Sequence, residues 1–341
     1  MDIRTFSSLI GVSTATVSRA FSGRGVVGTA TREHVLSEAR RLNFSPNVLA
    51  RRLSMQSSGV LGLYYSFGDE AIFDYYNMEL AQEVAKAAAA SGFGLHLELA
   101  PRRTPVPTDP ATQLAALAAG KAIDGLVVVS DGHESAGHLL AQLKGTPAVI
   151  LTGEYHAGLD CLAQVVIDFE PGVRAAVDHL VACGHRQIGF VRGLGDGAKL
   201  SALQKALAAH GLKPADVAMR TGHKTFADGQ RAFAELRAAG VTAAVCATDI
   251  LALGAIHGAS AAGVKLPREF SIIGIDDLAI AEHSVPTLSS IGVPRATLAR
   301  TAIETLVGAL RKTTGDDEAA PAHLPVSTYF IPRESSGPLS A

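Results

Sequence analysis

The chain has 341 residues, of which 48% are hydrophobic and 18% are charged, with a formal net charge of −2. This length predicts two or three domains, and the composition supports a sizeable buried core. The three cysteines, Cys161, Cys183 and Cys246, are far apart and odd in number, which argues against a disulfide framework or a clustered metal site. No apolar run approaches the length of a membrane span and no signal segment opens the chain, so the sequence predicts a cytoplasmic protein.

The near-neutral total charge hides an asymmetry along the chain. Residues 1–58 contain eight arginines and three acidic residues, a charge of +5, whereas the remainder carries 22 basic and 29 acidic residues, a charge of −7. A basic head on an acidic body indicates a polyanion that is bound at one end only.

The first predicted element is a helix over residues 2–10. Asp2 is placed to cap its N-terminus, and Ile3, Phe6 and Leu9 share one predicted apolar face. Gly11 then supplies a flexible turn, which lets two short helices meet at a steep angle. This pattern is typical of the start of a helix-turn-helix.

The second helix, up to Phe21, is the predicted recognition helix. Ser13 is placed to cap it, and Val12, Val17 and Ala20 are expected to face the small core. Arg19 is the strongest base-reading candidate, because a guanidinium can bond both O6 and N7 of a guanine. The alternative is an ordinary amphipathic helix with solvated Thr and Arg side chains. The residues expected to point outward, toward the major groove, are Thr14, Ala15, Ser18 and Arg19.

A third helix and a hinge follow. Thr29 begins a segment in which apolar residues recur at helical spacing up to Leu42. Ser45 and Pro46 then begin a very short helix. Such a helix is marginal in water, so we expect it to order only on DNA and against a second copy of the chain. Leu53 is expected to wedge between base steps from the minor groove; the alternative is a polar linker with one stray leucine.

The body, from about residue 59, alternates short apolar runs with helical segments. β-branched runs between helices predict parallel sheets with helices on both faces, and this length suggests two lobes of that α/β kind. In such sheets, ligands sit beyond the carboxyl ends of the strands. The predicted strands are residues 61–65, 94–99, 124–129, 148–151, 188–191, 243–246 and 271–275.

Three motifs in the head carry a resemblance to a known family. They are GVSTATVSRA at 11–20, TREHV at 31–35 and SPNVLARRL at 45–53. Their order and spacing resemble the DNA-binding head and hinge of the LacI/GalR (lactose-repressor) family of transcription regulators. In that family the positions matching Thr14, Ala15 and Arg19 read bases, and the leucine matching Leu53 enters the minor groove. The resemblance implies the DNA-binding residues Ser13, Thr14, Ala15, Thr16, Arg19, Asn47, Ala50, Arg51 and Leu53.

The body resembles the family's effector-binding core, which is itself similar to periplasmic sugar-binding proteins. Matching stretches include residues 166–169, 184–190, 274–277 and 286–291. The resemblance implies a homodimer through the lobes and chain crossovers near 158–162, 290–292 and 320–325. The implied domains are a helix-turn-helix domain at 1–44, a hinge helix and linker at 45–58, an N-terminal lobe at 59–160 with 291–320, and a C-terminal lobe at 161–290 with 321–334.

The implied effector site departs most from the family's pattern. Lys199 stands where an arginine is usual and lacks its fork geometry, and Thr248 stands where Asn is common. Asp276 keeps its place after a strand and is expected to bond effector hydroxyls. The aromatic rings near residue 75 either stack on a sugar or base ring or pack in the core. The candidate effector residues are Asp74, Tyr75, Tyr76, Lys199, Thr248 and Asp276.

No catalytic or metal-ligand constellation stands out, so we expect neither an enzyme nor a cofactor. The sequence predicts a DNA-binding transcriptional regulator, a repressor, controlled by a small-molecule effector such as a sugar or related metabolite. It is expected to act as a homodimer on a roughly palindromic operator, with no membrane partner. The alternatives are an activator of the same family, a solute-binding protein or a sugar-processing enzyme. The basic head and the missing signal segment argue against a solute-binding protein, and the missing catalytic set argues against an enzyme.

Overall fold

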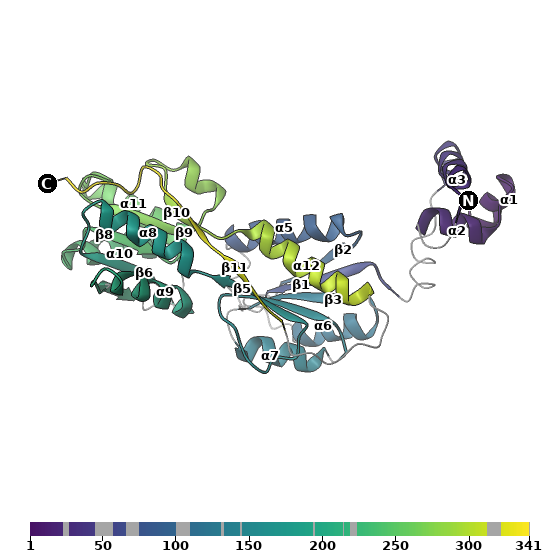
Figure 1. Cartoon of the computed structure of the whole chain (residues 1–341), viewed down its shortest axis with the longest axis horizontal. Coiled ribbons are helices and arrows are strands. Elements are labelled where there is room, and N and C mark those ends of the chain that lie inside the picture. Colours follow the sequence, from purple (N-terminus) through teal and green to yellow (C-terminus); the bar gives the residue numbers. More distant parts are fainter. Residues whose placement is uncertain are drawn as a thin grey trace. The chain divides into compact units, whose positions relative to one another are not determined.

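The computed structural model describes residues 1–22, 27–44, 57–65, 75–99, 110–130, 133–143, 145–193, 195–213, 215–218, 224–311 and 322–340. Contacts divide the chain into two compact units, Met1–Gly59 and Val60–Ala341 (Figure 1). The first unit holds three helices and the second holds two sheets with their covering helices. Within the described ranges, no helix is both long enough and apolar enough to cross a bilayer.

The first unit is a head formed by α1 (Ile3–Leu9), α2 (Thr14–Ser22) and α3 (Thr29–Arg41). The Asp2 side chain accepts a hydrogen bond from the Thr5 N–H at 2.8 Å, so the predicted cap of α1 is confirmed. The Phe6 and Phe44 rings stack with centroids 3.9 Å apart, which links α1 to the residues after α3. The buried side chains of the head are Phe6, Val17, Ala20, Val35, Ala39 and Phe44.

The predicted apolar face of α1 is wrong at one position. Leu9 is 63% exposed, whereas Ser7 is buried and Ile10 packs against the head core. The inward face therefore follows Ile3, Phe6, Ser7 and Ile10, which is the i, i+3, i+4, i+7 spacing of a helix. The Ser7 hydroxyl donates to a backbone carbonyl three residues earlier, which satisfies this polar group inside the head.

The second unit contains two six-stranded sheets (Figure 1). The first sheet has the order β11-β5-β4-β3-β1-β2, and all of its pairs are parallel. Its strands are β1 (Val60–Tyr65), β2 (Gly94–Leu99), β3 (Gly125–Val129), β4 (Ala148–Thr152), β5 (Ala163–Asp168) and β11 (Ala322–Ser327). One face is covered by α5 (Tyr75–Ala90) and α12 (Arg295–Arg311), and the other by α6 (Pro110–Ala119) and α7 (His133–Gln142).

Side chains of the first sheet alternate between two clusters. Leu63 and Val127 join the cluster that includes α5 and α12, whereas Tyr64 and Val128 join the cluster that includes α6 and α7. In β1, β3 and β4 almost every residue is buried and apolar, which is why the sequence predicted these strands, whereas β5 and β11 were not among the predicted strands.

The second sheet has the order β12-β10-β9-β8-β6-β7 and is parallel except for its edge strand β12. Its strands are β6 (Ile188–Arg192), β7 (Ala215–Ala218), β8 (Ala243–Cys246), β9 (Ser271–Asp276), β10 (Ser289–Gly292) and β12 (Tyr329–Ile331). Its helices are α8 (Glu170–Ala182), α9 (Gly197–Ala208), α10 (Phe226–Ala238), α11 (Asp249–Ala261) and the 3₁₀ segment η2 (Ala279–His283). The predicted strands at 188–191, 243–246 and 271–275 are confirmed.

The first and third chain crossings between the sheets differ from the predicted ones, whereas the second lies next to its predicted place. β5 pairs with β4, so the first crossing follows Asp168 rather than lying near 158–162. β10 pairs with β9, so the second crossing follows Gly292. β11 pairs with β5, so the third crossing lies at Thr328. The predicted C-terminal lobe therefore included β5 and β11, which belong to the first sheet, because a strand's own sequence does not specify which sheet it joins.

Thr328 ties the first and third crossings together. Its N–H and its hydroxyl both donate to the Asp168 carbonyl, at 3.0 and 2.9 Å. The Gly172 N–H donates to the Thr328 hydroxyl oxygen at 3.2 Å, and a Cβ on Gly172 would lie 2.6 Å from that oxygen. The two crossing segments are therefore hydrogen-bonded to each other inside the second unit.

Candidate nucleic-acid interface and candidate effector site

The turn before α2 has the local structure that its sequence predicts. Gly11 has φ +70°, in the left-handed region that glycine adopts without a Cβ penalty. The Ser13 hydroxyl oxygen accepts the Thr16 N–H at 3.0 Å and also lies 2.8 Å from the Thr16 hydroxyl. The prediction that Ser13 caps the second helix is therefore confirmed.

The α2 helix has one buried and one exposed face. Val17 and Ala20 are buried and Val12 is half-buried, as predicted. The side chains exposed at its start are Thr14, Ala15, Ser18 and Arg19. Small side chains near a helix N-terminus allow close approach to base edges, and an arginine one turn along can reach a guanine. The exposed face of α2 therefore carries side chains suited to contacting base edges in the major groove.

Five predicted site residues lie outside the described residues: Asn47, Ala50, Arg51, Leu53 and Asp74. Their expected roles in the hinge and at the effector site remain predictions.

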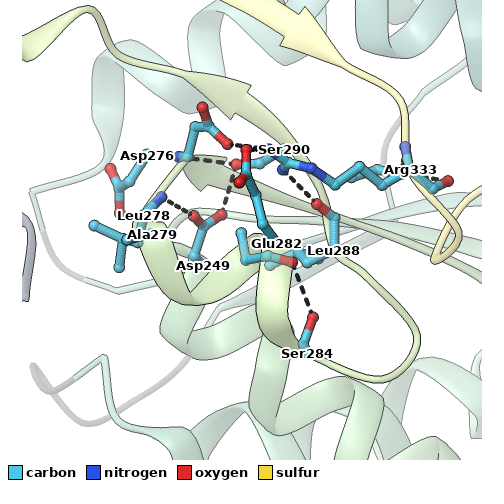
Figure 2. A network of polar contacts seen from close by, with 12 residues as sticks. Asp249, Asp276, Leu278, Ala279, Glu282, Ser284, Leu288, Ser290 and Arg333 are labelled. Atoms are coloured by element: carbon cyan, nitrogen blue, oxygen red, sulfur yellow. Dashed lines mark hydrogen bonds and ion pairs between the residues drawn. The ribbon is translucent and has the colours of Figure 1, made fainter.

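In the second unit, the candidate effector residue Asp276 ends β9 and begins the 276–279 turn (Figure 2). Asp276 has φ +123° and Asp277 has φ +53°, a region that favours glycine over residues with a Cβ. Such a conformation persists where the surrounding structure holds it. Asp276 is almost completely buried, at 6% exposure.

Asp249, the first residue of α11, holds this turn through two hydrogen bonds (Figure 2). Its carboxylate accepts the Leu278 N–H at 2.7 Å and the Ser290 hydroxyl at 2.6 Å, and that hydroxyl oxygen accepts the Asp277 N–H at 3.0 Å. Burial raises the pKa of Asp249 to about 7, although both hydrogen bonds act in the opposite direction. A Cβ on Gly274 would lie 2.1 Å from the Asp249 carboxylate, so glycine leaves the space that the carboxylate occupies.

Arg333 reaches the same turn from the segment after β12. Its guanidinium lies 2.8 Å from the Asp277 carboxylate and 3.1 Å from that of Glu282. It also donates to the Leu288 carbonyl at 2.8 Å. Asp277 is therefore paired with Arg333, a cation of its own lobe.

Lys199 belongs to a separate charged group at the carboxyl ends of β6 and β8. Its ammonium donates to the Ala247 carbonyl at 2.7 Å and lies 3.4 Å from the Asp196 carboxylate. Lys224 also pairs with Asp196, at 2.8 Å. Burial acts to raise the pKa of Asp196, but the two lysines hold that pKa below its usual value. The structure therefore gives Lys199 partners within the protein.

The remaining predicted effector residues have structural partners of their own. Thr248 caps α11, since its side chain accepts the Leu251 N–H at 3.2 Å. Tyr76 packs against the first lobe's core, and the Arg295 guanidinium lies 5.9 Å from its ring centre. Tyr75 is 54% exposed.

The structure gathers the predicted effector residues into two groups. Lys199 donates to the carbonyl of Ala247, the residue before Thr248, whereas Tyr76 and Asp276 share Arg295 as a partner. Sequence reasoning missed Arg295, Glu79, Asp196, Asp249 and Arg333. A usable signal existed for two of them: Asp249 begins a mainly apolar helix, and Arg295 follows a proline that comes two residues after a strand.

Comparisons with known proteins agree with this architecture. The model "Bacterial regulatory proteins, lacI family" matches residues 7–47, and "Periplasmic binding protein-like domain" matches residues 177–336. The transcriptional regulator CelR of Thermobifida fusca is 28% identical, with 96% of both chains covered. Catabolite control protein A of Priestia megaterium is 28% identical, with 89% of this chain and 91% of that one covered.

Two solved structures show the same fold. The Lac repressor dimer bound to operator and the anti-inducer ONPF has a TM-score of 0.75 at 22% identity, covering 97% of this chain and 98% of that one. The CelR–cellobiose complex has a TM-score of 0.67 at 25% identity, covering 98% and 99%.

A helix-turn-helix head with an exposed recognition helix, joined to a body of two mainly parallel sheets, defines a DNA-binding transcriptional regulator. The chain belongs to the lacI family of bacterial regulatory proteins. The predicted fold class is confirmed. The named relatives are regulators rather than enzymes, which confirms that part of the prediction.

Proposed function

We propose that this regulator is a cytoplasmic repressor that binds a roughly palindromic operator as a homodimer. A small-molecule effector, a sugar or related metabolite, binds between the two lobes and changes the affinity for the operator. The observation that carries the proposal is the exposed start of α2 on a self-contained head, with Thr14, Ala15 and Arg19 facing solvent.

An exposed apolar surface supports the homodimer. Met78 on α5 is 59% exposed, Ile280 on η2 is 43% exposed and Val285 is 92% exposed. The Ala279 N–H donates to the Glu79 carboxylate at 3.2 Å, so the residues next to Met78 and Ile280 contact each other across the lobes. Exposed large apolar side chains favour protein contacts, and a two-fold dimer places two heads on symmetric half-sites.

The second unit supports control by an effector. Asp276 and Lys199 lie at the carboxyl ends of strands in one sheet, where open α/β sheets bind ligands. The related CelR was solved with cellobiose, a sugar. An effector that favours one arrangement of the lobes shifts operator affinity by a coupling of roughly 1–3 kcal/mol.

Selection of bound sequences from a random DNA pool by the full chain tests the DNA-binding part. The proposal expects two related half-sites, and Arg19→Ala should relax the preference at one base pair of each half-site by about 1–3 kcal/mol. Arg40→Ala, which removes an exposed arginine of α3, is the matched control and should weaken all sequences alike or not at all. A wild-type chain with no sequence preference would contradict the proposal.

A thermal-shift screen of sugars, sugar phosphates, nucleosides and carboxylic acids tests the effector part. A compound that binds the native state raises the melting temperature by mass action. Asp276→Asn should reduce that shift, whereas Asp178→Asn, at an exposed position of α8, should leave it unchanged. Equal shifts in wild type and the Asp276 variant would remove Asp276 from the effector site.

A further inference from the structure

The backbone of the 276–279 turn is held from both lobes. In its own lobe, Ser290 accepts the N–H of Asp277 and Asp249 accepts that of Leu278. From the first lobe, the Glu79 carboxylate accepts the Ala279 N–H at 3.2 Å. Three consecutive N–H groups are thus bound by side chains, and the third bond joins the lobes.

Arg295 supplies the complementary contacts to the carbonyl groups. One guanidinium nitrogen donates to the Asp276 carbonyl, and the other donates to the Asp277 carbonyl at 2.8 Å. The second nitrogen also lies 2.8 Å from the Glu79 carboxylate. Only 15% of the Arg295 side chain and 29% of the Glu79 side chain are exposed, so water screens these contacts less than it screens a surface ion pair.

Both side chains belong to the first lobe. Glu79 lies on α5 and Arg295 opens α12, and these two helices pack against each other. The α12 helix also contacts β3, β4 and β5 of the first sheet. The pair is therefore carried by a packed part of one lobe and grips a turn of the other, and we call it the Glu79–Arg295 clamp.

The planar fork of Arg295 matches what this turn requires. It reaches two successive carbonyl groups, and the first belongs to Asp276, whose φ of +123° needs outside support. A lysine would bring one point charge and could not span both carbonyls and the Glu79 carboxylate in the same way. Arg295 therefore holds the backbone of Asp276, the residue whose side chain is the candidate effector contact.

We infer that the Glu79–Arg295 clamp joins the two lobes and positions Asp276, so that the clamp couples effector binding to the arrangement of the lobes. The inference rests on the proposed function in one respect, namely that Asp276 meets the effector. Any ligand that moves the Asp276 backbone must strain or open the clamp. By reciprocity, opening the clamp changes the affinity for that ligand.

Hydrogen exchange of the effector-free full chain, followed by mass spectrometry, tests the clamp directly. The readout is the amide of Ala279, which donates to Glu79. Glu79→Ala should make this amide exchange about tenfold faster or more, as expected for losing a hydrogen bond to a charged acceptor. Arg295→Gln should accelerate the same amide, because Glu79 loses the cation that holds it.

The controls are two substitutions on the same helices. Glu83→Gln on α5 and Arg300→Gln on α12 change an acid and an exposed arginine outside the clamp and should leave the Ala279 amide unchanged. Arg295→Lys, which keeps the charge but loses the fork, should give an intermediate rate. Melting curves of every variant show whether the fold is retained, and Arg295→Lys keeps the test informative if Arg295→Gln does not fold.

Unchanged exchange at Ala279 in both Glu79→Ala and Arg295→Gln would overturn the clamp. So would a double variant whose acceleration equals the product of the single effects, because coupled partners are not additive. These measurements need neither DNA nor effector. Failure of the proposed function would instead appear as a wild-type chain without sequence-selective DNA binding, so the two failures are distinguishable.

Discussion

The head and the 276–279 turn present functional side chains in opposite ways. In the head, Thr14 and Arg19 project from a regular helix, whose cap Ser13 lies three residues from its partner Thr16. At the turn, Asp276 is buried, and the groups that hold its neighbours come from distant parts of the chain. The head relies on local structure and the turn on long-range contacts, so a substitution should act differently in each.

The largest expected effect is on the head core. Phe6→Ala removes a fully buried ring that stacks on Phe44, which should cost the head about 3–5 kcal/mol. A unit this small has a small free energy of unfolding, so the head should unfold and DNA binding should be lost. Calorimetry should show the transition of Val60–Ala341 at its wild-type temperature. A joint shift of both transitions would contradict the independence of the two units.

The next effect is at the turn. Gly274→Ala places a Cβ 2.1 Å from the Asp249 carboxylate, and displacing that group should destabilise the second unit by about 1–3 kcal/mol. The matched control is Gly308→Ala on α12, where an added Cβ meets nothing within 4 Å. Denaturant unfolding measures both, and equal stability of the two variants would show that the turn tolerates movement of Asp249.

A smaller effect is expected at the cap of the recognition helix. Ser13→Ala removes the acceptor of the Thr16 N–H and should cost the head about 1 kcal/mol. Because this contact is local, the unfolding transition of the second unit should not respond. The melting temperature of the head measures the effect, and Ser37→Ala on α3 is a control, since its hydroxyl bonds a backbone carbonyl within the helix. A head that is equally stable in both variants would show that the cap contributes nothing.

The smallest effect concerns pH. His185 is completely buried, with its ring nitrogens 3.0 Å from the hydroxyls of Thr242 and Ser271. Burial lowers its pKa below 6.5, although the nearby Gly337 carbonyl acts in the opposite direction. The unfolded chain therefore binds the proton first, and the stability of the second unit should fall as pH drops below about 6.5.

The raised pKa of Asp249 acts on stability in the opposite direction below about pH 7. Protonation of Asp249 relieves the cost of burying its charge, so its contribution to stability rises as pH falls. The measurement is therefore a comparison of unfolding free energies between wild type and His185→Gln from pH 5 to pH 8, in which the contribution of Asp249 cancels. Wild type should lose more stability than the variant on the acid side. If the free energies of unfolding of wild type and variant changed equally with pH, the pKa of His185 would be the same in the folded and unfolded chain.

Local patterns made much of the fold predictable from sequence. The cap at Asp2, the cap at Ser13 and the apolar strands were all read from residues close together, and all are confirmed. The prediction for Leu9 was wrong because two apolar faces are possible on such a short helix. In the structure, the face that contains Ser7 and Ile10 packs against the core of the head.

The assembly of the second unit was less predictable. β11 lies far along the chain from β5, yet the two strands pair, and no local signal indicates that. The same holds for the contacts between Glu79 and Ala279 and between Arg333 and Asp277. The candidate effector residues were chosen by matching positions of the family's effector site, which included Asp276 but not the partners that hold its turn.

The bond network of Thr328 has a mechanical consequence. Two of the three segments that join the lobes are hydrogen-bonded to one another through this side chain, so they cannot slide past each other without breaking those bonds. A rotation of one lobe relative to the other must therefore turn both segments together or break these bonds. The third joining segment follows Gly292, which pairs with Tyr329 beside Thr328, and it leads within three residues to Arg295, so the clamp and the Thr328 bonds act at the same junction of the two lobes.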